Sequence, residues 1–357
     1  MKQYYDDSWL TTNVWGKWGA DDEVGAMNMI TPETVLKAAT LIKEGKVYDL
    51  ETERFKGMPI WPGHCGFDII SYASPKGRRN MLESNYDPSF NWSAEGGMLD
   101  PKCDDYTMGL NTEIMVAPLH LGTHIDAFCH WTTGDDDHWY NGFTADKYCT
   151  SFGPVRTDIA KIPPIVARGV LLDIAGYKGV DALPDNYIIT AEDCDGCAKW
   201  EGVELKAGDC VLCRTGQVWP ACKEAVSAGM SVNAARYLVE GHGAILIGDD
   251  QASIEGFNAD GSSSWPNHPQ PVHHYMLIQQ GVHILEFVQL DELAKDKKYE
   301  FLFICTPSKI RSATGMFVRP IAGPIMIFCV VMLLWPVVMP MIKKHRASKD
   351  GQTDAKA

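Results

Sequence analysis

The stretch that decides the fold is His120-Leu-Gly-Thr-His124-Ile-Asp126-Ala-Phe-Cys-His130. Imidazole nitrogen combined with carboxylate oxygen, as here, is a ligand set for zinc or manganese. Residues 112–119 before it are rich in Ile, Met and Val, which indicates a strand running into the motif. Side chains of an extended segment repeat every two residues, so His120, His124 and Asp126 would share one face. The sequence therefore predicts an extended metal-binding segment.

A helical zinc site is the alternative for two histidines at this spacing. A helix would bring His120 and His124 together but would turn Asp126 well round the cylinder. The helical signature also requires Glu directly after the first histidine, and here that residue is Leu121. Gly122 lies on the same face of an extended segment and leaves room for an ion or substrate. The pattern thus disfavours a helical metalloprotease.

Composition limits the class of protein. The 357 residues suffice for one large domain or two ordinary ones, and 45% hydrophobic with 22% charged residues is typical of a globular protein. The formal net charge of −14 argues against nucleic-acid binding, which needs clustered Lys and Arg. The N-terminus lacks the apolar core of a secretory signal. Eleven scattered cysteines indicate reduced thiols in a cytoplasmic environment.

Two C-x-x-C pairs, Cys194/Cys197 and Cys210/Cys213, come close to the spacing of a zinc ribbon. Residues 191–205 nevertheless indicate a helix, and residues 209–215 a buried strand. On a strand, Cys210 and Cys213 would face opposite sides. We therefore favour cysteines that act as small core residues.

Strands and helices alternate in the second half of the chain, while the first half is looser. Thr31 and Pro32 predict the start of a helix that ends near Glu44, before Gly45. Long loops are expected over residues 58–105 because Gly, Pro, Asn and Ser are frequent there. Further predicted strands are 47–50, 168–173, 209–213, 244–247 and 282–288, and further helices are 191–205, 231–240 and 271–280. The fold class is α/β or α+β.

A second group of possible ligands lies far downstream. His273 and His274 are expected on a helix, and Glu286 on the next strand. A carboxylate that bridges two ions, with His and Glu completing the second ion, is a common arrangement in hydrolytic sites. Spacing alone leaves open whether the two groups meet.

Several motifs resemble the metal-dependent cyclase family, which includes bacterial kynurenine formamidase and isatin hydrolase. The first is His120-x-Gly-Thr-His124-x-Asp126-x-x-x-His130. The others are Trp18-Gly-x-Asp-Asp-Glu, Arg168-Gly-Val-Leu-Leu-Asp173, Arg214-Thr-Gly, Ile247-Gly-Asp-Asp-Gln-Ala-Ser253 and Ala313-Thr-Gly-Met-Phe-Val-Arg-Pro320. The resemblance extends from about Trp15 to Ile321. It implies a swivelling β/β/α fold that assembles as a homodimer or larger homo-oligomer.

The resemblance also implies roles for individual residues. His120, His124 and Asp126 would hold a first Zn²⁺ or Mn²⁺, and Asp126 would bridge to a second ion held by His274 and Glu286. The family spacing of twelve residues to the glutamate selects His274 over His273. His130 occupies the position of the general base. The family usually has proline where this chain has Phe128, which puts the substrate in doubt more than metal binding.

Less specific interpretations remain for several residues. His130 can be a structural histidine bonded to a backbone carbonyl. Asp250 or Thr123 can orient a ligand imidazole. Asp249 and Asp250 are expected to close a turn. No ligand pattern includes His242, His268, His273 or His283.

The reaction implied by the resemblance is hydrolysis of a non-peptide C–N bond, in an aryl formamide or a cyclic amide. The substrate would be a small molecule, and an aromatic amide would suit the aromatic residues near the motif. A lactonase, dehydratase or isomerase on the same site is an alternative, since a fold does not fix the reaction. A membrane-tethered metal-binding scaffold without turnover is another.

Residues 325–342 contain no charged side chain, and Lys343-Lys-His-Arg346 follows directly. At about 1.5 Å per residue, an apolar helix of this length approaches the thickness of the hydrocarbon core of a bilayer. We therefore predict a catalytic domain over 1–322, a transmembrane anchor over 323–342 and a polar tail over 343–357. The catalytic domain would be cytoplasmic. The alternative is a hydrophobic arm that packs on a partner subunit.

Overall fold

A computed structural model describes residues 2–58, 60, 63–73, 111–217 and 227–323. The chain separates into two compact units. The larger unit comprises Met1–Glu53 and Gly122–Ala357, and the smaller unit comprises Arg54–Leu121. Each is described by itself below.

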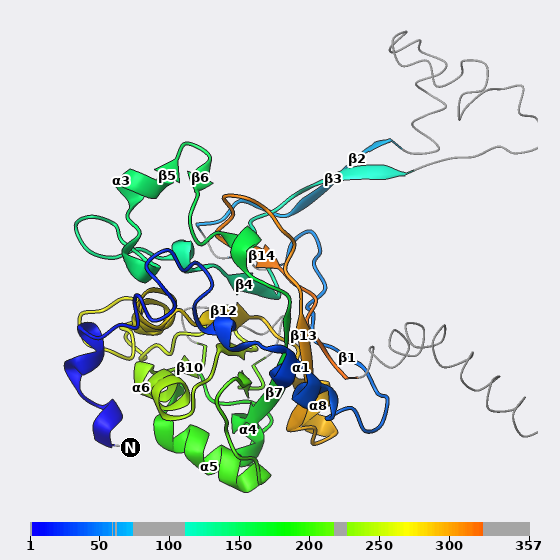
Figure 1. Ribbon diagram of the computed structural model, residues 1–357. Coiled ribbons are helices and arrows are strands. Elements are labelled where there is room, and N and C mark those ends of the chain that lie inside the picture. The colour runs from blue at the N-terminus through cyan, green and yellow to red at the C-terminus, as the bar shows by residue number, and fades with distance from the viewer. Residues whose placement is uncertain (1, 59, 61–62, 74–110, 218–226, 324–357) are drawn as a thin grey trace, which may run out of the picture. The chain divides into compact units, whose positions relative to one another are not determined.

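A nine-stranded mixed sheet forms the centre of the larger unit (Figure 1). Its strands, in spatial order, are β1 (Tyr48–Asp49), β15 (Ile321–Ala322), β13 (Glu300–Cys305), β7 (Ile165–Asp173), β9 (Cys210–Arg214), β11 (Leu246–Asp249), β12 (His283–Glu286), β4 (His124–Asp126) and β14 (Gly315–Phe317). The four strands from β7 to β12 run parallel, and the flanking pairs are antiparallel. The predicted mixed α/β class is therefore confirmed.

The parallel strands are continuous apolar runs because both of their faces are covered. All of β11 and β12 is buried, and so are the last five residues of β7. Helices α4 (Ile174–Tyr177), α5 (Ala191–Glu201) and α6 (Val232–Arg236) pack together, and α5 also contacts β7 (Figure 1). Helix α1 (Pro32–Ala39) contacts β7 and β13, and α8 (Asp291–Lys295) contacts β7.

The helix start predicted at Thr31 and Pro32 forms as expected, although α1 is shorter than predicted. Thr31 and Thr34 make a reciprocal capping box at the start of α1, and Thr190 and Asp193 make one at the start of α5. Helix α1 ends at Ala39 and not near Glu44. Its last turn tightens, because the Thr40 N–H donates to the Lys37 carbonyl three residues back.

Two of the predicted helices change to π-helix along their length. The first is α6 followed by η8 (Tyr237–Gly241), and the second is α7 (Pro271–His273) followed by η9 (His274–Gln280). A π-helical stretch holds an extra residue relative to an α-helix and so shifts the faces that neighbouring residues occupy. His273 and His274 stand at the junction between α7 and η9.

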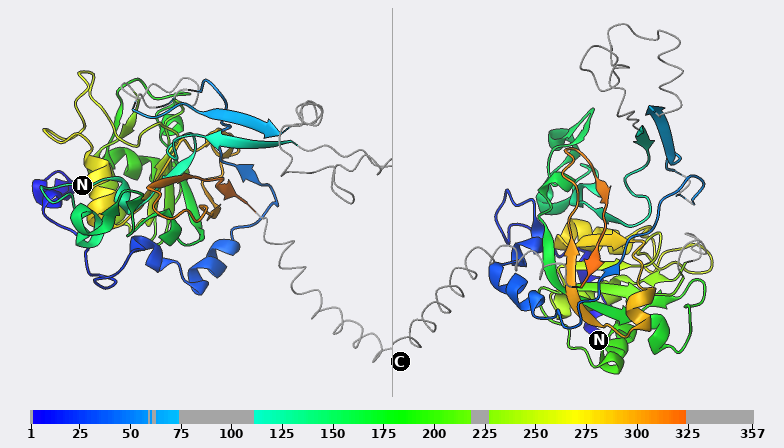
Figure 2. Two further views of the ribbon diagram at one scale, coloured as in Figure 1. Left: turned by 90° about the horizontal axis from the view of Figure 1, so that it is seen from above. Right: turned by 90° about the vertical axis from the view of Figure 1, so that its right-hand side faces the viewer.

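The N-terminal segment lies beside α6 and η9 (Figure 2). The Val14 N–H donates to the Gln279 carbonyl, and the Arg236 guanidinium donates to the Asp6 carbonyl. Short 3₁₀ helices here and elsewhere are η1 (Lys2–Tyr4), η2 (Asp7–Leu10), η3 (Gly25–Met29), η4 (Phe128–His130), η5 (Tyr140–Gly142) and η6 (Ile159–Lys161). The remaining small elements of the larger unit are α3 (Ala145–Tyr148), the pair β5 (Cys149–Thr150) and β6 (Gly153–Pro154), and the pair β8 (Ile188–Ile189) and β10 (Gly229–Met230).

The smaller unit contains an antiparallel pair of strands, β2 (Asp68–Ala73) and β3 (Thr112–Val116). The prediction of loops throughout 58–105 is wrong for β2, whose apolar residues pair with those of β3. Large side chains of both strands are about half exposed, namely Ile69, Ile70, Ile114, Met115 and Val116. Residues 74–105 of the predicted loops lie outside the described residues.

The predicted membrane anchor and polar tail also lie outside the described residues, apart from Gly323. Within the described part of the chain, every helix is too short or too polar to span a bilayer. The anchor therefore stays a prediction.

Candidate metal centre

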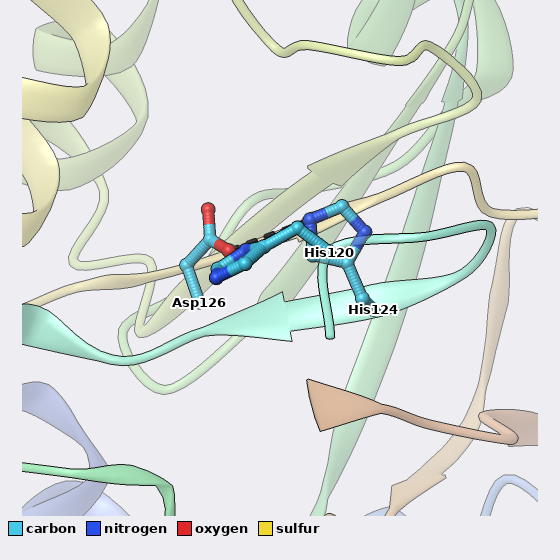
Figure 3. A group of neighbouring side chains, drawn as sticks. All are labelled: His120, His124 and Asp126. Carbon is cyan, nitrogen blue, oxygen red and sulfur yellow. Dashed lines mark ion pairs between the residues drawn. The ribbon is translucent and has the colours of Figure 1, made fainter. Parts of the chain in front are cut away.

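Strand β4 carries the central part of the sequence motif between β12 and β14. His124 and Asp126 lie two residues apart on β4, and both side chains leave the same side of the strand (Figure 3). In the antiparallel pairing of β4 with β12, His124 stands directly opposite Glu286. Cross-strand partners share a face. The sheet register thus brings Glu286 to the two residues of the motif.

His124 is oriented from both ends of its imidazole. Its Nδ1 lies 2.8 Å from the carbonyl oxygen of Gly122, whose φ of 58° is in the left-handed region that favours glycine. Its Nε2 lies 3.4 Å from Asp126 Oδ1 and 3.3 Å from Glu286 Oε2. Burial alone would lower the pKa of His124, but the Asp126 and Glu286 carboxylates outweigh burial and raise the pKa to about 10.

The residue that joins this cluster from the helix is His273, whereas the prediction named His274. His273 Nε2 lies 3.5 Å from Glu286 Oε1 and 3.9 Å from Asp126 Oδ2. Asp126, His273 and Glu286 form a buried group able to hold a metal ion. The His274 imidazole instead lies 2.6 Å from that of His268 and packs edge-on against Trp9.

The physical reason is the geometry of the helix. Adjacent helical residues point about 100° apart, so only one of the two histidines can face β12. The π-helix η9 begins at His274, directly after His273, and its turns hold more residues than those of an α-helix. Counting twelve residues back from Glu286 therefore selects the wrong neighbour.

The carboxylates of Asp126 and Glu286 each contact the imidazoles of both His124 and His273. Glu286 is buried, which by itself would raise its pKa, but hydrogen bonds from His124 and His273 lower the pKa to about 2. Burial likewise lowers the pKa of His273, whereas the carboxylates of Glu255 and Glu286 raise it to about 10.

The donor set fits a divalent ion. His124, Asp126, His273 and Glu286 are each at most 4% exposed. A tetrahedral zinc with bonds of about 2.0–2.1 Å has ligand atoms about 3.4 Å apart. The closest imidazole–carboxylate separations, 3.3 to 3.5 Å, match this value. Two carboxylates would neutralise one dication when both imidazoles are neutral.

His120 precedes β4 in the chain and is the last but one residue of the smaller unit. The local segment from His120 to Asp126 places one ligand atom of each of His120, His124 and Asp126 within 4.8 Å of the others (Figure 3). His120 does not belong to a strand; it lies in the bend before β4. The expectation of one extended segment over all three residues thus holds for His124 and Asp126.

His130 ends the short helix η4 that follows β4. Its ring centre lies 6.4 Å from that of His273 and 5.8 Å from that of Trp131. This position is beside the ligand cluster.

Phe128, where the family usually has proline, is a core residue. Its ring stacks on His283 with centroids 4.0 Å apart. His283 Nδ1 in turn lies 2.7 Å from the Asp126 carbonyl oxygen. Burial lowers the pKa of His283 to about 4, so the imidazole is neutral and Nδ1–H can donate to that carbonyl. Phe128 and His283 thus support the end of β4.

A residue other than the two expected contacts a ligand imidazole. Asp250 accepts hydrogen bonds from Thr215 and from the Gly216 N–H, and Thr123 Oγ1 donates to the Phe287 carbonyl. Glu255 instead accepts from His273. Sequence reasoning missed Glu255 because a single carboxylate in a loop has no spacing pattern that marks it.

Within the described residues, the cysteines form no third candidate metal-binding group. Cys194 and Cys197 lie on α5, Cys210 and Cys213 lie on β9, and all four are buried free thiols. The two groups of three or more possible metal ligands found in the described chain contain no cysteine.

The chain belongs to the cyclase family: the family model Cyclase matches residues 48–256. The match includes the motif from His120 to His130 and ends before His273 and Glu286. The resemblance inferred from the motifs is therefore confirmed.

Among curated proteins, the chain is similar to isatin hydrolase from Roseibium aggregatum. The two are 27% identical over 224 residues, which cover 58% of this chain and 73% of the relative. Among solved structures, one described as a novel cyclase has a TM-score of 0.71 at 26% identity and covers 88% of this chain and all of that chain. Isatin hydrolase A from Ralstonia solanacearum has a TM-score of 0.51 at 19% identity, with 82% of this chain and 97% of that chain covered. This last match supports the fold alone.

Proposed function

We propose that the protein is a metal-dependent hydrolase that opens a non-peptide C–N bond in an aryl formamide or a cyclic amide. The observation that carries the proposal is the convergence of His124, Asp126, His273 and Glu286 in a buried cluster with metal-ligand separations. The name of the curated relative gives isatin, a cyclic amide fused to an aromatic ring, as that relative's substrate. This supports a small aromatic amide as substrate here.

In this proposal His120, His124 and Asp126 hold a first Zn²⁺ or Mn²⁺, and Asp126, His273 and Glu286 hold a second where two ions bind. A bound ion of this kind lowers the pKa of its water to about 7 and polarises a carbonyl oxygen. Asp126 and Glu286 supply the negative charge that keeps the dication in a buried site.

His130 is the proposed general base. An imidazole can accept and return a proton near neutral pH, and His130 stands at the edge of the ligand cluster. It would take the proton of the attacking water and deliver it to the nitrogen that leaves the carbonyl carbon. Water is thereby added across the C–N bond, giving an amine and a carboxylic acid, which releases its proton to solvent at neutral pH.

A homodimer or larger homo-oligomer is part of the proposal. The apolar side chains exposed on both faces of β2 and β3 are of the kind that subunit interfaces bury. Sedimentation analysis of the purified protein measures the oligomeric state directly.

The function is tested by removing and restoring the metal. The chelated protein, and the same protein reconstituted with Zn²⁺ or with Mn²⁺, is assayed against aryl formamides, cyclic amides and lactones, with metal content measured in parallel. We expect turnover of an amide only after reconstitution. Hydrolysis of lactones alone would assign the site to a lactonase, and metal binding without any turnover would support a scaffold.

The role of His130 is tested by His130→Ala. We expect the variant to keep its metal and to lose about 10²- to 10⁴-fold in kcat, the usual contribution of a positioned acid–base group. His242→Ala is the matched control, since that imidazole packs on Tyr237 and belongs to neither candidate ligand group. Turnover of the His130 variant at the parental rate would remove His130 from the mechanism.

A further inference from the structure

Glu255 makes a two-point contact with His273. Its Oε1 accepts a hydrogen bond from the His273 backbone N–H at 2.8 Å and lies 2.9 Å from His273 Nδ1. The Glu255 residue is fully buried. A buried carboxylate is costly unless it is paired and hydrogen-bonded, so its placement against one imidazole indicates a specific task.

The loop that carries Glu255 also holds Glu286. The N–H of Ile254 donates to Glu286 Oε1 at 2.8 Å. One dipeptide therefore contacts both residues that complete the second ligand group, His273 through a side chain and Glu286 through a peptide N–H.

This loop is fixed by the neighbouring backbone. The Met230 N–H donates to the Ile254 carbonyl at 2.7 Å, and the Gly256 N–H donates to the Met230 carbonyl at 2.9 Å. A Cβ at Gly229 would approach the Glu255 carbonyl oxygen to 2.1 Å, so the two segments can pack this closely only with glycine. A loop held in this way can set the direction of a side chain that leaves it.

We propose that Glu255 is a positioning residue for the metal site: it holds His273 with Nδ1–H directed at its carboxylate and Nε2 directed at Asp126 and Glu286. The inference rests on the proposed function, because His273 is there a metal ligand. A carboxylate on the far nitrogen fixes the tautomer and ring orientation of a ligand imidazole and raises its basicity, and such partners contribute about 10- to 100-fold to metal affinity.

Two variants distinguish the effect of Glu255 on the orientation of His273 from the effect of its negative charge. Glu255→Gln keeps an oxygen that can accept from both N–H groups but removes the negative charge, and Glu255→Ala removes both. Glu201→Gln is the matched control, because Glu201 is a largely buried glutamate that accepts the Asp173 N–H at 2.7 Å.

Zn²⁺ affinity of the chelated proteins is measured by calorimetric titration in competition with a chelator. We expect about 100-fold weaker binding for Glu255→Ala, about tenfold for Glu255→Gln, and a change of less than about twofold for the control. Circular dichroism confirms folding. If the alanine variant fails to fold, the glutamine variant decides. Parental affinity in a folded Glu255→Gln variant and in any folded Glu255→Ala variant would overturn the proposal.

A second measurement does not depend on metal binding. In protein labelled with ¹⁵N-histidine, the His273 Nδ1–H proton should give a signal protected from exchange, identified by its loss in His273→Ala. We expect the signal to persist in Glu255→Gln and to disappear in Glu255→Ala. Persistence in a folded Glu255→Ala variant would refute the orienting role. If the parental chain binds no metal, the proposed function fails, and this signal still decides whether Glu255 orients His273.

Discussion

Glu286 is buried and Glu201 is largely buried, yet their surroundings move their pKa values in opposite directions. Two imidazoles face Glu286 and keep it ionised with a pKa of about 2. Burial raises the pKa of Glu201 to about 8, against smaller opposing contributions from the Asp173 N–H and the Cys197 thiol. Two imidazole partners thus keep one carboxylate ionised, whereas desolvation without a cationic partner favours the neutral form of the other.

The raised pKa of Glu201 predicts a pH dependence of stability. Between pH 4.5, near its unfolded pKa, and pH 8 the folded protein holds a proton that the unfolded chain has lost. Unfolding releases that proton, so the free energy of unfolding falls as pH rises through this window. With about 1.4 kcal/mol per pKa unit, and partial exposure of the side chain, we expect a loss of roughly 2 kcal/mol.

Urea unfolding at pH 5 and pH 8 measures this loss. Glu201→Gln should reduce the difference between the free energies of unfolding at pH 5 and pH 8. The amide does not titrate, and its oxygen can still accept from the Asp173 N–H. An unchanged pH dependence in the variant would show that other groups cause it.

At the scale of the element, the helix that runs from α7 into η9 decides the composition of the site. His273 faces the carboxylates of Asp126 and Glu286, while His274 lies against His268 and Trp9. Burial lowers the pKa of His274 to about 4, as expected for a neutral imidazole in an aromatic environment.

Alanine substitution of each histidine tests this assignment. His273→Ala should weaken metal binding at least about tenfold because it removes a proposed ligand, whereas His274→Ala should leave the affinity within about twofold. Elemental analysis and titration with Zn²⁺ measure both. The reverse order of effects would restore His274 as the ligand and would contradict the register of η9.

At the scale of the whole molecule, residues 325–342 remain the part of the chain for which sequence makes the strongest untested prediction. We expect full-length protein to stay with membranes after carbonate extraction, because the segment is apolar and uncharged. Truncation after Gly323 should release the protein. That end point retains β15 and the hydrogen bond from Gly323 to Leu302. Full-length protein in the soluble fraction would exclude the anchor.

Local patterns in the sequence sufficed for much of the fold. The apolar runs of β7, β9, β11 and β12 and the capping boxes of α1 and α5 follow from residue type and spacing over a few positions. Strand β2 was missed because its apolar residues sit among loop-forming residues and are stabilised by pairing with the distant β3.

The sequence by itself determined that His124 and Asp126 share a face, because alternation along a strand is a local property. Only the tertiary structure decided that Glu286 stands opposite His124, that His273 and not His274 joins them, and that Glu255 holds His273. Sheet register, the packing of α7 and a loop hydrogen-bonded to β10 produce these contacts. Each depends on residues far apart in the chain, whose relative placement no local pattern encodes.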